Sequence, residues 1–120
     1  MKKIFALTVL FSCIAVCQTF AQTDKSKRPS PPATITQNIK GGATISIEYS
    51  QPSVKGRTIG KDLEPMDNKV WRTGANEATI FETDKAVNIQ GQKLPAGKYA
   101  LFTFFNGSDC TIIFNKKWDQ

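Results

Sequence analysis

The stretch "KYALFTFFNGSDCTIIFN", residues 98–115, decides which fold the chain can adopt. Its first half, Lys98 to Phe105, is apolar on both faces that a strand would present, which is typical of a central strand covered on two sides. Asn106-Gly107 tolerates the positive φ angles of a type I′ turn, and the run from Cys110 to Asn115 is again strand-like. The stretch therefore predicts a β-hairpin, in which Cys110 acts as a small buried apolar residue.

Shorter strands are expected on the N-terminal side of this hairpin. The run from Ala43 to Tyr49 alternates apolar and polar residues with a period of two, and Gly41-Gly42 separates it from a similar run. Strands are predicted at residues 33–39, 43–49, 77–83 and 86–90, with a turn at residues 91–93. Because no stretch has the period of an amphipathic helix, the fold class is all-β, an antiparallel β-sandwich or a jelly-roll-like fold.

One long loop interrupts this pattern at residues 51–68, "QPSVKGRTIGKDLEPMDN". It is rich in proline and glycine and shows little periodicity, apart from one helical turn expected between Pro65 and Trp71. Loops longer than about 12 residues within compact domains are uncommon and are often functional. The loop leads directly into the most unusual segment of the chain, at residues 69–79.

The N-terminus has the features of a secretory signal peptide. Lys2 and Lys3 precede an apolar run from Ile4 to Val16, and Thr19 and Ala21 are the small residues that signal peptidase requires. Cleavage after Ala21 is expected, which predicts a periplasmic or extracellular protein. The apolar run is shorter than the roughly 20 residues of a transmembrane helix, so no membrane span is expected.

The predicted organisation is a signal peptide at residues 1–21, a flexible linker at residues 22–32 and a single β-sandwich domain at residues 33–120. A lipoprotein signal with Cys13 or Cys17 as the lipidated residue is the weaker alternative. The chain stops shortly after Trp118, which suggests that the domain is incomplete at its C-terminal end. Such a domain would leave a strand edge unpaired and able to self-associate.

Charge and composition exclude several classes of function. Removal of the signal takes away two of the 16 basic residues and none of the 10 acidic ones, leaving a net charge of +4. This mild basicity is not the signature of a nucleic-acid-binding protein. The absence of histidine removes the common nucleophilic triads and most catalytic zinc sites, so no cofactor and no metal site are expected.

Carboxylates are then the remaining catalytic candidates. Glu77 with Glu48 or Glu82 could form a pair of the kind that hydrolyses glycosidic bonds, at a separation of roughly 5 to 9 Å. A hydrolase that acts on envelope glycans is therefore one hypothesis. Carboxylates on strands more often belong to the solvated face of an antiparallel sheet.

The segment "KVWRTGANEAT", residues 69–79, supports two opposed interpretations. In the first, it forms a site for an anionic or glycan ligand, because arginine binds carboxylates with two parallel hydrogen bonds and an aromatic ring suits a sugar. The residues proposed for this site are Arg57, Trp71, Arg72, Asn76 and Glu77. In the second, the segment is a structural clamp: Arg72 pairs with Glu48 or Glu77, Gly74 adopts a positive φ, and Asn76 bonds to the backbone.

Four segments resemble, in order, the signatures of a secreted bacterial family known as domain of unknown function 2911. They are "YSQPSVKGRTIG", "VWRTGANEAT", "IQGQKLPAGKYALFT" and "TIIFNKKW". The resemblance implies an exported β-rich domain without an established activity, whose members continue beyond the position of Trp118. The signature residues fall on Tyr49, Pro52, Gly56, Arg57, Trp71, Arg72, Gly74, Asn76 and Glu77.

Together these observations favour a non-catalytic binding or interaction module of the cell envelope. The glycan hydrolase is one alternative. A structural domain that associates through an exposed strand edge is the other.

Overall fold

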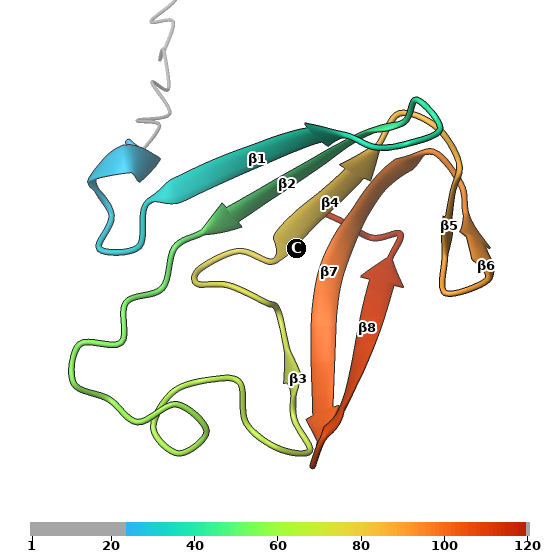
Figure 1. Cartoon of the computed structure of the whole chain (residues 1–120). Coiled ribbons are helices and arrows are strands. Elements are labelled where there is room, and N and C mark those ends of the chain that lie inside the picture. Colours follow the sequence, from blue (N-terminus) through green and yellow to red (C-terminus); the bar gives the residue numbers. More distant parts are fainter. Residues whose placement is uncertain (1–23, 120) are drawn as a thin grey trace, which may run out of the picture.

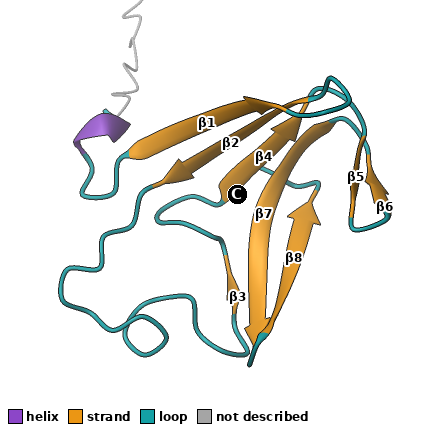
Figure 2. Cartoon of the chain, in the orientation of Figure 1, coloured by secondary structure: helices purple, strands orange, loops and turns teal. Residues whose placement is uncertain are grey.

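The computed structural model describes residues 24–119, which form strands, loops and one short 3₁₀ turn (Figures 1 and 2). The elements in chain order are η1 (Lys25–Lys27), β1 (Pro32–Asn38), β2 (Thr44–Ser50), β3 (Val70–Trp71), β4 (Thr79–Thr83), β5 (Val87–Ile89), β6 (Gln92–Leu94), β7 (Gly97–Asn106) and β8 (Asp109–Asn115). No helix in this part of the chain is long and apolar enough to cross a bilayer.

Six strands form one antiparallel sheet around β7, the longest strand. The order runs from β1 through β2 and β4 to β7. β4 and β3 follow one another along one edge of β7, and β8 pairs with residues 100–106 on the opposite edge. β5 and β6 form a separate two-stranded hairpin (Figure 1). The predicted class, an all-β antiparallel protein, is confirmed, and the sheet is not closed into a barrel.

The aromatic part of the core lies on one face of this sheet, here called the aromatic face, whereas the fully buried Ala100 lies on the other. The Phe114 ring contacts Phe81 edge-on at a centroid distance of 5.1 Å and Tyr99 at 6.2 Å. Edge-to-face packing suits the quadrupoles of the rings and adds to the stabilisation from their burial. The Tyr99 hydroxyl donates a hydrogen bond to the Pro95 carbonyl at 2.9 Å, so its polar end is satisfied within the core. Cross-strand partners share a face, so Leu101, opposite Phe114, also belongs to the aromatic face.

The predicted N-terminal hairpin is confirmed, with Ala33 opposite Tyr49 and a turn at residues 39–43. The predicted helical turn between Pro65 and Trp71 is wrong. Instead, Val70 and Trp71 pair with Phe104 and Thr103 as strand β3. The one 3₁₀ turn lies at Lys25–Lys27.

Two details of the decisive hairpin also differ from the prediction. Asn106 ends β7, and the turn consists of Gly107 and Ser108, of which only Gly107 has a positive φ, 59°. A positive φ at the first central position alone is the pattern of a type II′ turn, not of type I′. Cys110 is exposed and not buried, and it lies next to the turn of this hairpin, two residues after Ser108.

Phe81→Ala should lower the free energy of unfolding by about 3 to 5 kcal/mol, because it removes a buried ring from the aromatic cluster. Chemical denaturation of the purified chain measures this change. Ile35→Ala is the matched control: Ile35 is 57% exposed on β1, and its truncation should change the stability by no more than about 0.5 kcal/mol. Equal effects of the two changes would contradict the placement of the core.

Candidate functional site

The segment between β3 and β4 leaves the sheet as a bulging loop, here called the excursion, residues 72–78. Trp71 pairs with Thr103 and Thr79 pairs with Leu101, so β7 offers only Phe102 opposite the whole segment. The chain must therefore move out of the sheet before it rejoins β7. The Thr79 N–H donates to the Arg72 carbonyl at 3.1 Å and closes the base of the loop.

The inside of the excursion is packed against the end of β2. The Ala75 N–H donates to the Ser50 carbonyl at 3.1 Å, and the Thr79 hydroxyl donates to the Thr73 carbonyl at 2.9 Å. The residues with positive φ are Thr73 and Asn76, so the expectation of a positive φ at Gly74 is wrong. Gly74 is needed for a different reason: a Cβ there would lie 2.9 Å from the Thr79 hydroxyl oxygen.

Gly74→Ala should destabilise the domain by about 1 to 3 kcal/mol, because the added methyl group overpacks this contact. Chemical denaturation of the single variants and of the double variant Gly74→Ala/Thr79→Ala tests the cause. Thr79→Ala removes the crowding oxygen, so Gly74→Ala should cost less in that background. Strictly additive effects would show that the hydroxyl does not restrict the position.

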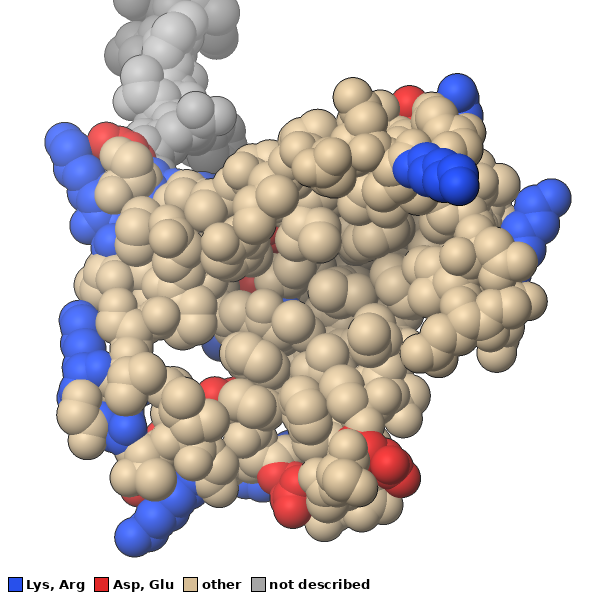
Figure 3. Space-filling model, in the orientation of Figure 1, with Lys and Arg blue, Asp and Glu red and all other residues tan. Residues whose placement is uncertain are grey.

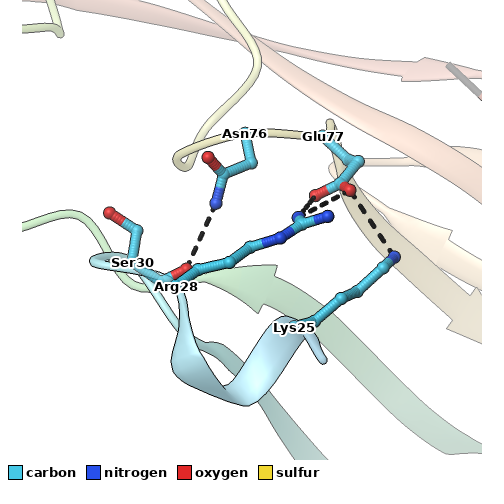
Figure 4. Close-up of polar contacts among 5 residues, drawn as sticks. All are labelled: Lys25, Arg28, Ser30, Asn76 and Glu77. Atoms are coloured by element: carbon cyan, nitrogen blue, oxygen red, sulfur yellow. Dashed lines mark hydrogen bonds and ion pairs between the residues drawn. The ribbon is translucent and has the colours of Figure 1, made fainter. Parts of the chain in front are cut away.

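The outer side of the excursion binds the segment that precedes β1 (Figure 4). The Arg28 guanidinium donates from Nη1 to both carboxylate oxygens of Glu77, at 2.8 and 3.0 Å. The Lys25 ammonium lies 3.5 Å from the same carboxylate, and the Asn76 amide donates to the Ser30 carbonyl at 3.2 Å. Residues 24–31, which belong to the predicted linker, thus contact the domain at the predicted site.

This arrangement changes the chemistry of Glu77. The hydrogen bond from Arg28 is the main reason that the pKa of Glu77 is lowered from 4.5 to about 2, and the charge of Lys25 acts in the same direction. Glu77 is therefore ionised at any pH near neutrality. The stability that this pairing contributes is fully present above about pH 4.5 and is lost as the pH falls toward 2.

Arg28→Gln should raise the pKa of Glu77 toward 4.5, because it removes the largest cause of the shift. An NMR titration of the side-chain carboxyl carbon measures the pKa directly. Lys27→Gln is the control, since Lys27 lies 3.7 Å from Asp24 and forms no described contact with Glu77. A midpoint that stays near 2 in Arg28→Gln would contradict the contact in Figure 4.

Arg72 differs from the other charged residues of the segment. It is exposed, and among residues 24–119 its side chain takes part in none of the hydrogen bonds or ion pairs of the structure. The pairing of Arg72 with Glu48 or Glu77 expected for a clamp is not formed, and Arg28 takes the position at Glu77. Arg57 donates to the Val54 and Ser53 carbonyls of its own loop, which fixes its side chain.

Two adjoining cavities flank Arg72. The first, here called the loop cavity, has a volume of about 590 Å³ and lies between the long loop, the excursion and β7. Its wall includes Arg57, Leu63, Trp71, Arg72, Asn76 and Phe102. The second, the side cavity, has a volume of about 530 Å³ and shares Arg72, Asn76 and Phe102 with the first. Figure 3 shows basic side chains along the margin that η1 and the long loop form beside this region.

The predicted ligand residues are therefore brought together, although their roles differ. Arg57, Trp71, Arg72 and Asn76 line the loop cavity, while Glu77 lines the side cavity and is occupied by Arg28. Trp71 is half-buried and pairs with Thr103, which places its side chain on the aromatic face. Val70 pairs with Phe104, so both lie on the opposite face of the sheet, as does Phe102. Val70 and Phe102 both line the loop cavity, so Phe102 is the aromatic ring on the cavity's side of the sheet.

The structural residues of the predicted motif surround the same region. Pro52 lines the loop cavity, and half-buried Tyr49 lies at the end of β2. Gly56 is exposed and has a φ of 74°, which L-residues rarely adopt, so it makes a turn in the long loop.

The catalytic candidates are only partly assembled. Glu48 and Glu77 line one cavity of about 330 Å³, together with Lys25 and Trp118. Glu82 lies elsewhere and pairs with Lys98 at 3.6 Å. A general acid needs a raised pKa to carry its proton at neutral pH, whereas that of Glu77 is lowered. Glu77 is thus unsuited to the acid role in glycoside hydrolysis.

The acidic residues of the long loop serve its turns. The Asp62 carboxylate accepts a hydrogen bond from the Thr58 N–H at 3.2 Å, and Glu64 accepts one from the Met66 N–H at 2.8 Å. Within residues 24–119, no group of three or more acidic, cysteine or histidine side chains could hold a metal ion.

Two residues of the site were not predicted from the sequence. Arg28 lies in a segment that contains nothing to bury, and no local pattern indicates that it reaches Glu77, far along the chain. Phe102 was assigned only to the central strand. Phe102 lies between the β7 residues that pair with β3 and with β4. This position depends on how the strands pair, and no pattern in the local sequence indicates it.

The fold and the site define an antiparallel all-β domain with a basic cavity between a long loop and the central strand. The chain belongs to the family described as Protein of unknown function (DUF2911), whose family model matches residues 30–120. The match includes the long loop, the excursion and the sheet. The comparisons with curated proteins and with solved structures give no match.

Proposed function

We propose that the chain is an exported, non-catalytic binding module of the cell envelope and that its loop cavity holds an anionic glycan. The observation that carries the proposal is Arg72: it lines both cavities, and its guanidinium has no partner among the described residues. An unpaired guanidinium in a concave wall is a natural receptor for a carboxylate or a sulfate group, which it binds with two parallel hydrogen bonds.

The surrounding charges favour an anion at this position. Arg57 is the second guanidinium in the wall of the loop cavity, and Glu64 is the carboxylate that accompanies them. The Glu64 carboxylate already accepts a hydrogen bond from Met66, and Glu77, in the side cavity, is neutralised by Arg28. The uncompensated charge beside Arg72 is therefore positive.

The rest of the wall suits the ring of a sugar. Phe102 provides an apolar surface that both cavities share, against which the C–H groups of a pyranose can pack. The Asn76 amide donates to Ser30 and retains a second N–H and its carbonyl oxygen for hydroxyl groups. A glycan that carries carboxylate groups uses all of these features together.

The placement in the cell envelope rests on the predicted signal peptide. Residues 1–21 carry its charged start, apolar middle and small residues near Ala21, and they lie outside the described residues. A protein exported by this route meets anionic polysaccharides outside the cytoplasm, which agrees with the chemistry of the cavity.

Binding of an oligogalacturonate tests the proposal, with a neutral oligosaccharide of the same length as the comparison ligand. Isothermal titration of the exported chain should detect binding of the anionic oligosaccharide alone. Arg72→Ala should weaken this binding at least tenfold, because it removes a charge-assisted hydrogen-bonding group. The stability should change by no more than about 0.5 kcal/mol, because exposed Arg72 has no structural partner.

Lys93→Ala is the matched control, since Lys93 is an exposed cation on the distant β5–β6 hairpin. An equal loss of binding in both variants would indicate a general charge effect and would contradict a site at Arg72. A large loss of stability in Arg72→Ala would instead make Arg72 a structural residue.

A further inference from the structure

In the part of the chain that the structure describes, the outer edge of β8 is unpaired. The strand pairs with β7 from Asp109 to Asn115, and no other strand within residues 24–119 pairs with it. An open edge presents a row of backbone N–H and C=O groups that can pair with another strand.

The register of the hairpin determines which residues present these groups. Asn106 and Asp109 close the two-residue turn, and hydrogen-bonded and non-hydrogen-bonded pairs alternate along antiparallel strands from that point. Cys110, Ile112 and Phe114 therefore direct their backbone groups away from β7. The contacts of β7 agree with this assignment. Phe105, the partner of Cys110, directs its carbonyl away from β8, where it accepts a hydrogen bond from the Asn68 N–H at 2.8 Å.

Nothing in the middle of β8 prevents pairing. Edge strands of soluble proteins are usually protected by proline, charge or a bulge, and the run from Cys110 to Phe114 contains no proline or charged residue. Ile112 is 53% exposed and Ile113 is 37% exposed, on opposite faces of the strand. The other outer strand, β1, begins at Pro32, directly after Pro31.

A groove of about 370 Å³ follows the same edge on the side of the β5–β6 hairpin. Ile112 and Phe114 line it from β8, and Ile89 and Leu94 line it from the hairpin. These apolar side chains would contact the side chains of a strand added next to β8.

We propose that the strand added to β8 is the β8 of a second copy of this chain, paired antiparallel with Ile112 opposite Ile112. In this register Cys110 of each copy lies opposite Phe114 of the other. The outward backbone groups of the two strands then form on the order of six hydrogen bonds. The two-fold axis closes the assembly, because each copy uses its edge completely.

The charges at the ends of the strand fit this orientation. Asp109, the first residue of β8, and Lys116, which directly follows its last residue, are both exposed. In the proposed register Asp109 of one copy lies opposite Asn115 of the other, one position from Lys116, at both ends of the interface. Parallel pairing would place like charges side by side.

Sedimentation of the exported chain over a range of concentrations tests the assembly. The expected result is a monomer–dimer equilibrium that Ile112→Lys abolishes, because two ammonium groups would then face each other at the centre. Ile35→Lys on β1 is the matched control, since Ile35 has a similar exposure of 57% and lies on the other outer strand. The control should dimerise like the wild type.

Cross-linking tests the register. In a Cys110→Ser background, Ile112→Cys should form a disulfide-linked dimer under mild oxidation, because directly opposite residues meet the geometry of a disulfide. Ile113→Cys is the control and should not cross-link, since Thr111 lies opposite it.

A monomer at all concentrations, a dimer lost in Ile35→Lys but kept in Ile112→Lys, or equal cross-linking of both cysteine variants would each overturn the proposal. None of these outcomes depends on the loop cavity.

Discussion

The structure of the site depends on one constraint: β3 and β4 pair with almost adjacent positions of β7, although seven residues separate them in the chain. β7 is a continuous strand, and both short strands pair with the same edge of it, but only Phe102 separates their pairing positions. The chain between them cannot lie in the sheet. It must bulge, and the hydrogen bond from Thr79 to the Arg72 carbonyl fixes the width of the bulge at its base. Residues 72–78 therefore lie outside the plane of the sheet, and the cavities lie between this bulge and β7.

The same constraint separates the two sides of the excursion. Its inner side is held by backbone bonds to Ser50 and by the close approach of Gly74 to Thr79, so its conformation does not depend on a ligand. Its outer side carries Asn76 and Glu77, which bind the segment before β1. Arg72 lies at the start of the bulge, and its side chain belongs to neither set of contacts. If an anion binds to Arg72 as proposed, a loop held in this way would lose little conformational entropy on binding.

Much of the fold could be predicted from the sequence, because period-two alternation and turn residues are local signals. The hairpin of β1 and β2 and the central position of β7 are examples. The predicted helical turn before Trp71 failed because proline and acidic residues resemble a helix start, whereas pairing with β7 decided the outcome. The residue types in the long loop and in residues 69–79 predicted four candidate residues together: Arg57, Trp71, Arg72 and Asn76. Their roles could not be predicted, since the partner of Glu77, Arg28, lies in a segment without any local structural pattern.

The described contacts divide the segment at residues 69–79 into a part that holds the fold together and a part that does not. A carboxylate that accepts bonds from Arg28 and lies close to Lys25 serves a structural contact, and its lowered pKa reports that contact. Perturbed pKa values mark structural ion pairs as well as functional sites. In this domain the perturbed group, Glu77, marks the clamp. Arg72, whose side chain has no partner among residues 24–119, lines the concave surface to which the proposed ligand would bind.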